Sequence, residues 1–462
     1  MFNYHLLLPE IFLTTVIVFL LTFGLFYKNK FHYLAVITLI WVFILLFNIP
    51  SFSSISDIFL LNSFNNFIKL IIVVSSIIYL FLLNKYQNFE FIVLILISLL
   101  GLFLLVSANN LLVFYLAIET ISLSFYILAA INKNNSFSTE AGLKYFILGA
   151  LSSGLLLFGC ALIYFSTGFI DFSSLSHLAI SNSFLIGSIF IIVALLFKIA
   201  AAPFHMWIPD VYEGSPLYVT FFFATIPKIG ILYIFYYFIF HVFYNIFDPN
   251  IQSLLIFSSL LSITIGTFGA IYQNKIIRLI AFSAVAHIGF ILLGFSTGSF
   301  ISIYSSFIYI IIYIIMSFFT FSFILSLNNK YFADLLSLSK INPVLAISFA
   351  FSLLSIAGIP PLAGFFSKFY ILYSLVENNL YIVALFAIIL SVVASYYYIR
   401  IIQWMFFNSS TLFNTYFSLS SLPGKITTAH SIILGSTTYF ILTFLFYPKP
   451  LLLLTFDLLC YF

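Results

Sequence analysis

Long apolar segments, separated by short polar connections, recur along the whole chain. Fourteen of them approach the length of about 20 residues that an α-helix needs to cross the hydrocarbon core of a bilayer. The connections are rich in Asn, Ser, Asp and Pro, as turns are, and the longest irregular stretch, 406–429, is rich in Ser and Thr. The pattern predicts an all-α polytopic membrane protein with about 14 transmembrane helices. The predicted spans are 8–26, 33–49, 67–84, 91–107, 110–131, 141–165, 184–204, 216–243, 252–272, 276–296, 301–327, 344–376, 380–405 and 430–447.

Composition supports this prediction and excludes several kinds of site. Hydrophobic residues make up 64% of the 462 residues and charged residues only 6%, which is too little charge to cover a water-soluble surface. The two cysteines, Cys160 and Cys460, lie far apart and form no C-x-x-C pair, so this chain alone cannot build an iron–sulfur cluster or a thiolate zinc site. There is also no Gly-rich phosphate loop. We therefore expect no metal and no cofactor in this chain, and lipid rather than nucleic acid around it.

The basic residues predict the orientation of the chain. When the connections are numbered in order, eleven of the sixteen Lys and Arg residues lie in or beside odd-numbered connections, and only Lys69 and Lys449 lie on the other side. By the positive-inside rule, the odd connections face the matrix or cytoplasm and both termini face the opposite side. The eleven residues are Lys28, Lys30, Lys85, Lys133, Lys144, Lys275, Arg278, Lys330, Lys340, Arg400 and Lys425.

Four ionisable residues remain inside predicted spans: Glu119, Lys198, Lys228 and Lys368. A charged side chain at bilayer depth costs about 2.5–3.5 kcal/mol on insertion scales, so such groups usually face a protein interior or a wet cavity and serve a function. Two structural alternatives stay open. A lysine near a helix end can extend its ammonium group to the interface, and a Glu–Lys pair can hold two helices together.

The first helix break follows Lys198. Pro203 has no N–H, so the carbonyl of Ile199 loses its helical partner, and freed backbone at membrane depth is tolerated only inside protein or beside a cavity. His205 lies seven residues after Lys198, and a histidine side chain can pass on a proton near neutral pH. A hydrogen-bonding role at the interface stays open for it. The stretch 210–216 is interpreted as an acidic turn at the membrane surface.

A second break, at Gly358-Ile359-Pro360-Pro361, interrupts a later span, and Lys368 follows within two turns. Two proline-interrupted spans at corresponding places, each with a lysine, are typical of inverted-repeat transporters. In this pairing Glu119 corresponds to His287. The predicted domains are an N-terminal three-helix segment at 1–90, two inverted five-helix repeats at 91–243 and 252–405, and a loop with a C-terminal helix at 406–462.

These groups suggest a proton relay. A carboxylate near a lysine favours its charged form, so Glu119 close to Lys198 would hold a proton on the lysine, and separating the two would release it. The predicted order is Glu119, Lys198, Lys228 and then Lys368, with water and either His205 or His287 between them.

Several motifs together resemble the antiporter-like membrane subunits of respiratory complex I, over about two-thirds of the chain. The motifs are Phe197-Lys198-x-x-x-x-Pro203-Phe204-His205-x-Trp207-x-Pro209-Asp210-Val211-Tyr212-Glu213-Gly214-Ser215-Pro216, Ile226-Pro227-Lys228-Ile229, Lys275-x-x-Arg278-Leu279, Ser283-x-x-x-His287-x-Gly289 and Gly358-x-Pro360-Pro361-x-x-Gly364-Phe365-x-x-Lys368. Spans 1–3 carry no matching motif.

The resemblance implies a proton-translocating subunit of NADH:ubiquinone oxidoreductase, with Glu119, Lys198, Lys228 and Lys368 as its protonatable residues. It also implies that NADH, FMN, iron–sulfur clusters and ubiquinone are handled by other subunits. The implied partners are a neighbouring antiporter-like subunit and small hydrophobic subunits. The implied location is the mitochondrial inner membrane or, alternatively, a bacterial plasma membrane. Two other classes stay open: a stand-alone multi-subunit cation/proton antiporter, and a membrane-arm scaffold without transport.

Overall fold

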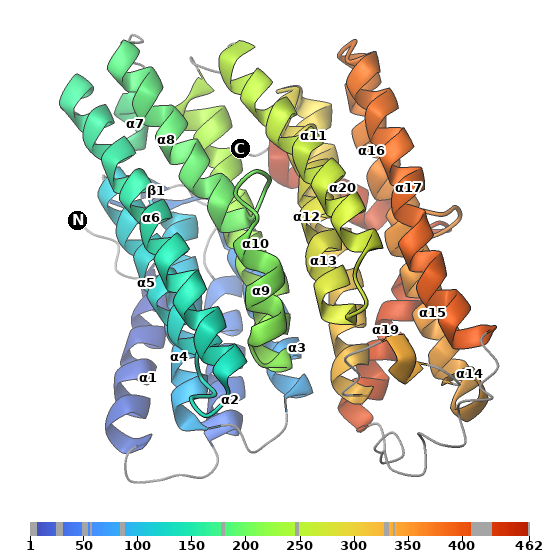
Figure 1. Cartoon of the computed structure of the whole chain (residues 1–462). Coiled ribbons are helices and arrows are strands. Elements are labelled where there is room, and N and C mark those ends of the chain that lie inside the picture. Colours follow the sequence, from blue (N-terminus) through green and yellow to red (C-terminus); the bar gives the residue numbers. More distant parts are fainter. Residues whose placement is uncertain are drawn as a thin grey trace. The chain divides into compact units, whose positions relative to one another are not determined.

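The described part of the protein is almost entirely helical (Figure 1). The structure, a computed structural model, describes residues 7–24, 31–48, 54–55, 58–83, 88–176, 181–244, 249–327, 332–335, 338–407 and 427–460. Within these ranges, ten helices are long and apolar enough to cross a membrane, and three shorter apolar helices accompany them. Each of the fourteen predicted spans overlaps at least one described helix. The prediction of an all-α polytopic membrane protein is therefore confirmed.

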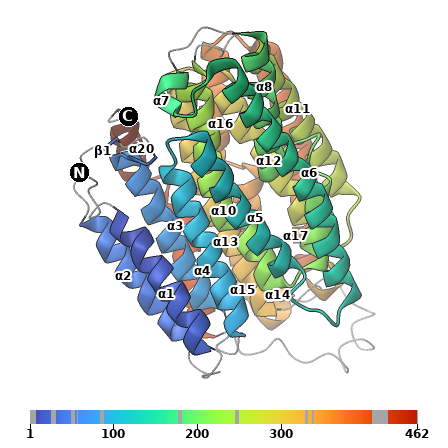
Figure 2. The same ribbon diagram turned by 90° about the vertical axis from the view of Figure 1, so that its left-hand side faces the viewer.

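The chain divides into two compact units. Unit 1 comprises Met1–Ile199, Gly214–Ile251 and Asp457–Phe462. Its helices α1 to α4 lie side by side (Figure 2), and α10 packs against α3 and α4. The elements of unit 1 are α1 (Leu8–Gly24), α2 (Phe31–Phe47), β1 (Ser54–Ile55), β2 (Leu60–Leu61), α3 (Ser63–Leu82), α4 (Phe89–Ser107), α5 (Leu111–Ala129), α6 (Ser136–Thr167), α7 (Phe172–Leu175), α8 (Asn182–Ile199), α10 (Leu217–Tyr237) and the π-helix η2 (Phe238–Val242).

Unit 2 comprises Ala200–Glu213 and Gln252–Phe456. Within it, α13 packs against α12, α15, α16 and α19. Its elements are α9 (Trp207–Gly214), α11 (Pro249–Ile271), α12 (Ile276–Ser296), α13 (Phe300–Leu327), the 3₁₀ helix η4 (Phe332–Leu335), α14 (Leu338–Ile341), α15 (Pro343–Ala357), α16 (Ala363–Glu377), α17 (Tyr381–Phe406), α19 (Thr428–Thr443) and α20 (Lys449–Cys460). The last residue of α9, the first residues of α11 and the last residues of α20 are assigned to unit 1.

Polar residues in the connections start several of these helices. The side chain of Asn110 accepts a hydrogen bond of 2.7 Å from the backbone N–H of Val113 at the start of α5. Asn342 caps α15 in the same way. Such N-caps satisfy backbone donors that a helix leaves without a partner, typically contributing about 1 kcal/mol. Polar residues in the connections therefore determine where these apolar helices begin.

Close packing of α6 on α8 depends on two glycines. A Cβ added at Gly159 would lie 2.8 Å from the backbone oxygen of Gly187, and one added at Gly187 would lie 2.9 Å from the oxygen of Gly159. Small residues at facing positions let two membrane helices approach backbone to backbone. This pair fixes the position of α8, which carries Lys198.

Both predicted breaks are present, but the segment after the first one was predicted wrongly. Helix α8 ends at Ile199, and the span predicted at 344–376 consists of α15 and α16. The stretch interpreted as an acidic turn is helical as far as Gly214, since α9 covers Trp207–Gly214. The terminal helix α20 was not predicted either. Most of the loop predicted at 406–429 lies outside the described residues.

Apolar side chains cover the surface of several helices. On α17, Ile382, Leu385 and Val392 expose 86%, 60% and 66% of their surface. A large exposed apolar surface is unstable in water and stable against lipid or another membrane subunit. The helical surface therefore agrees with a protein that crosses a bilayer.

Candidate functional site

Glu119 lies in the middle of α5 and is hydrogen-bonded within its own helix. The hydroxyl of Ser122 donates to Oε2 at 2.7 Å, and the hydroxyl of Tyr115 donates to Oε1 at 3.3 Å. The side chain is half-buried. These donors stabilise the carboxylate, because hydrogen bonds to a charged group are stronger than those between neutral groups.

Lys198 lies in the last turn of α8, in the same unit as Glu119. Its Nζ is buried, has no hydrogen-bond partner within the described ranges, and lies 6.0 Å from the centre of the Tyr126 ring. Glu119 is close enough to act on it electrostatically. The carbonyl end of α8 also favours a cation. Glu119 and Lys198 are thus brought together without a direct hydrogen bond, which is the arrangement that lets a small movement change their interaction.

Lys228 is the twelfth residue of α10 and directly follows Pro227, the proline inside this helix. Only 5% of Lys228 is exposed, and the residues around it on α10 are buried on every face. Pro227 cannot donate to the carbonyl of Phe223, so this carbonyl, on the helical turn that precedes Lys228, lacks its usual intrahelical partner. A lysine enclosed in this way does not extend to the interface.

Lys368 lies in unit 2, on α16, next to the second break. Its Nζ donates a hydrogen bond of 2.7 Å to the carbonyl of Ala357, the last residue of α15, and lies 5.4 Å from the centre of the Phe290 ring. The last carbonyls of a helix lack intrahelical partners and carry partial negative charge. The break therefore supplies the acceptor for the lysine.

His287 is buried on α12 between two tyrosine hydroxyls. Nδ1 lies 2.6 Å from the hydroxyl of Tyr309 on α13, and Nε2 lies 3.3 Å from the hydroxyl of Tyr398 on α17. Phe290, the aromatic neighbour of Lys368, lies three residues further along α12 and so on the same face. The face of α12 that carries His287 is therefore also the face that Lys368 contacts through Phe290.

A small cavity adjoins His287. It has a volume of about 30 Å³ and is lined by apolar side chains together with Ser283, Tyr313, Ser317 and Thr320. A cavity of this size holds a water molecule where polar groups are present to bind it. The arrangement around His287 can therefore pass a proton between hydroxyl, imidazole and water.

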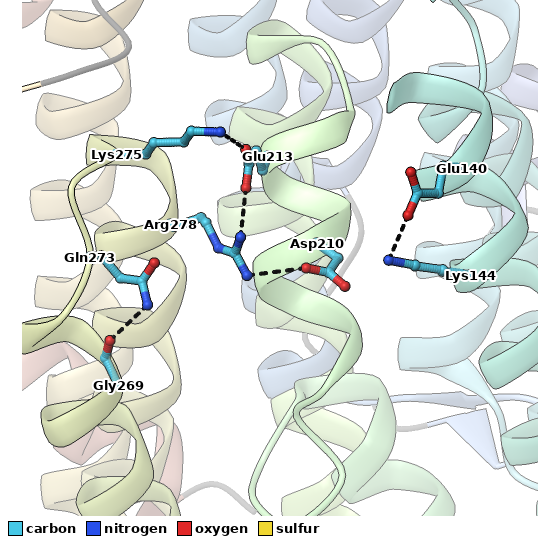
Figure 3. Close-up of polar contacts among 8 residues, drawn as sticks. All are labelled: Glu140, Lys144, Asp210, Glu213, Gly269, Gln273, Lys275 and Arg278. Atoms are coloured by element: carbon cyan, nitrogen blue, oxygen red, sulfur yellow. Dashed lines mark hydrogen bonds and ion pairs between the residues drawn. The ribbon is translucent and has the colours of Figure 1, made fainter. Parts of the chain in front are cut away.

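His205 is buried in the segment between α8 and α9, and a cluster of four charges follows on α9 and α12 (Figure 3). Arg278 Nη1 lies 3.1 Å from Glu213 Oε2, and Arg278 Nη2 lies 3.3 Å from Asp210 Oδ1. Lys275 also pairs with Glu213. The two acidic residues of the predicted turn are thus ion-pair partners of a basic pair.

The structure groups the candidate residues by unit. Glu119, Lys198 and Lys228 belong to unit 1, whereas His205, His287 and Lys368 belong to unit 2. Sequence reasoning missed Ser122, Tyr126, Tyr309 and Tyr398, which surround Glu119, Lys198 and His287. The chain has 30 tyrosines, so no single one stands out by its spacing. The order of the relay stays a prediction.

An all-helical membrane fold with charged residues at broken helices defines an antiporter-like transport subunit. A sequence model of the family described as NADH:quinone oxidoreductase/Mrp antiporter, TM, matches residues 108–429. The chain belongs to this family. A chain of the Mrp complex from Dietzia sp. shares the fold, with a TM-score of 0.79 at 20% identity over 98% of this chain and 92% of that chain.

Among its relatives, the chain is similar to one particular subunit. It is 44% identical to NADH-ubiquinone oxidoreductase chain 2 of Marchantia polymorpha, over 75% of this chain and 72% of the relative. It is 41% identical to NADH-quinone oxidoreductase subunit N of Pelagibacter ubique, over 97% and 98%. A chain of respiratory complex I from Thermus thermophilus with bound Aureothin superposes with a TM-score of 0.83 at 26% identity, over 96% and 98%. The motifs at 210–216 and Lys368-Phe369-Tyr370 favour the same subunit. The resemblance to the antiporter-like membrane subunits of respiratory complex I is confirmed.

Proposed function

We propose that this chain is a proton-translocating membrane-arm subunit of NADH:quinone oxidoreductase, respiratory complex I. The observation that carries the proposal is the enclosure of the Lys198, Lys228 and Lys368 ammonium groups inside protein, each beside a broken or proline-containing helix. Buried charges of this kind are costly and mark proton or ion pathways. The identity to complex I subunits above 40% supports the same function.

Each residue has a proposed role. Glu119 controls whether Lys198 keeps its proton, since the carboxylate stabilises the ammonium form only while it is near. Lys228 holds the proton in the centre of α10. His287 and Lys368 continue the relay in unit 2, with Tyr309 and Tyr398 orienting the imidazole and Ala357 holding the ammonium group. His205 serves as a further proton carrier between helices α8 and α9.

The redox chemistry belongs to other subunits in this proposal. NADH, FMN, iron–sulfur clusters and ubiquinone are bound elsewhere in the complex, and energy reaches this chain through its neighbours. Those neighbours are another antiporter-like subunit and small hydrophobic subunits. The membrane is the mitochondrial inner membrane or its bacterial counterpart, since relatives of both kinds match the chain.

The test is the Lys228→Ala variant in the whole complex, reconstituted in vesicles. We expect assembly to be retained and proton transport per vesicle to fall by roughly tenfold or more, as loss of a proton-transfer group usually causes. Lys144→Ala is the control, because Lys144 is 44% exposed and pairs only one turn away with Glu140 (Figure 3). Normal pumping in both the Lys228→Ala and Glu119→Ala variants would favour a scaffold without transport.

A stand-alone cation/proton antiporter is the second candidate, because the family and the Mrp fold match include such proteins. It predicts sodium-dependent pH changes in vesicles that contain no NADH oxidase activity. Co-purification of the chain with flavin and iron–sulfur subunits would exclude it.

A further inference from the structure

A buried ion pair joins two helices of the N-terminal three-helix segment. Lys69 of α3 donates to Glu10 of α1, with 2.5 Å between Nζ and Oε1. The two side chains are only 1% and 6% exposed. Neither residue belongs to the proposed relay, and no motif covers this part of the chain.

A polar line connects this pair to α10. Asn65 and Lys69 are four residues apart on α3 and therefore lie on one face of it. The hydroxyl of Tyr233 on α10 donates to Oδ1 of Asn65, which is completely buried. The line formed by Tyr233, Asn65, Lys69 and Glu10 is called the N-terminal polar line below.

The N-terminal polar line lies on a different side of α10 from Lys228. Tyr233 marks the side of α10 that faces α3, because its hydroxyl contacts Asn65. Lys228 lies five residues before Tyr233, which is about 140° around an α-helix. The Glu10–Lys69 pair is thus a separate ionisable site rather than an extension of the Lys228 site.

The pair lies toward one end of the segment. Glu10 is the third residue of α1 and Lys69 the seventh of α3, so they lie about 3 Å and 9 Å along their helices from the first residue. Both helices begin on the side predicted to face away from the matrix. The site is therefore close to the surface at which translocated protons would leave.

The contacts of Glu10 are those of a group that exchanges a proton. Its Oε2 is buried and, within the described ranges, has no hydrogen-bond partner. Replacing a buried ion pair by apolar side chains of similar volume is often neutral or stabilising, so the packing of α1 on α3 does not by itself require these two charges. Transfer of one proton from Nζ to the adjacent carboxylate neutralises both groups and breaks no other bond.

We propose that Glu10 and Lys69 form a proton-exchange site on the outer side of the N-terminal segment, an inference that rests on the proposed function. Lys69 gives its proton to Glu10, and Glu10 releases it to water at the outer surface. Lys69 then takes up a proton that comes from the proposed relay and crosses from α10 through water hydrogen-bonded along Tyr233 and Asn65, so that one proton enters the site for each one released. The ligand is H⁺, and the site is an exit station for protons.

Lys69→Arg in the whole complex tests the proposal, because arginine keeps the ion pair but does not give up its proton. A second variant, Glu10→Gln/Lys69→Gln, keeps hydrogen bonding and removes both charges. We expect each to assemble and to lower the number of protons pumped per NADH oxidised at least roughly twofold. The control pair, Glu140→Gln/Lys144→Gln, removes an exposed ion pair of the same unit and is expected to leave pumping unchanged.

Wild-type pumping in either Lys69 variant, while Lys228→Ala is impaired, would overturn the exit station and leave the proposed function intact. Failure of both variants to assemble would identify the pair as a clamp between α1 and α3 and would also overturn it. Normal pumping by both Lys228→Ala and Glu119→Ala is the separate result that contradicts the proposed function.

Discussion

The aliphatic stem of Lys368 passes over Gly358, which has a φ of 88°. A Cβ at Gly358 would lie 2.9 Å from Cδ and 3.1 Å from Nζ of the lysine. Gly358→Ala would therefore displace Lys368 from the carbonyl of Ala357, besides the cost of about 1–2 kcal/mol for a left-handed alanine. We expect lower proton transport in this variant, measured in vesicles containing the whole complex.

Gly168 provides the matched control for this prediction. It has a φ of 75°, and an added Cβ there meets no atom within 4 Å. Gly168→Ala should cause a similar loss of thermal stability with unchanged proton transport. Equal transport in the two variants would mean that the contact between Gly358 and Lys368 has no functional role.

The hydroxyl of Tyr309 is the closer of the two partners of His287. Tyr309→Phe removes a hydrogen bond of 2.6 Å and leaves a buried ring nitrogen without it, at a cost of about 1–3 kcal/mol. We expect proton transport to fall while the complex still assembles, as measured by a pH-sensitive dye and native gel electrophoresis. Tyr439→Phe, at a 69% exposed position of α19, should behave as the wild type; a similar fall there would indicate an effect unrelated to His287.

At the scale of helices, the sequence predicted the interruptions but not the partners. The prolines at 203 and 360–361 lack a backbone N–H whatever the tertiary packing around them, so the breaks after α8 and α15 follow from local chemistry. The partners of the buried charges depend on which helices pack together. Lys69 was assigned to a span end, yet it pairs with Glu10 across 59 residues of chain. Tertiary packing decides such contacts, and no local pattern records them.

Helix α9 was missed for a related reason. Its eight residues include Pro209 and two acidic residues, which alone suggest a turn. The helix is held by the charge cluster, in which Glu213 and Asp210 pair with Arg278 (Figure 3). The basic residues that stabilise α9 lie more than sixty positions later in the sequence, as the separations of 62 and 68 residues show.

Glu213→Gln is expected to loosen α9. The pairs are part-exposed and so contribute only about 0.2–1 kcal/mol, which corresponds to roughly 1.4- to fivefold faster hydrogen exchange of the α9 amides. High salt should narrow the difference, because it screens exposed charges. The measurement is hydrogen exchange by mass spectrometry on the solubilised complex. Glu140→Gln on α6 is the control and should leave α9 unchanged; equal exchange in all three proteins would show that the charge cluster does not hold the helix.

For the whole molecule, composition correctly predicted a polytopic membrane protein, because each helix that faces lipid needs an apolar surface. The described helices meet that need with exposed side chains such as Ile382 and Val392. The same composition gives no information on which ionisable groups share a unit. Packing of the complete chain decides this for His205, which lies in unit 2 with Lys368 although it falls in the same predicted repeat as Lys228. The orientation in the membrane, by contrast, depends on loop charge and so can be predicted from sequence alone.

The orientation prediction can be tested with two exposed lysines from opposite groups. Lys133 lies in an odd-numbered connection and Lys449 on the other side, and both are exposed. In sealed vesicles with the matrix face outward, a membrane-impermeant maleimide should label Lys133→Cys and spare Lys449→Cys until detergent is added. The wild type reports background labelling of Cys160 and Cys460. If the labelling pattern were reversed, Glu10 and Lys69 would lie on the matrix side, and the exit station would have to act as an entry. If both positions were labelled from one face, the predicted number of spans between them would be wrong, because an odd number of crossings must separate residues on opposite faces.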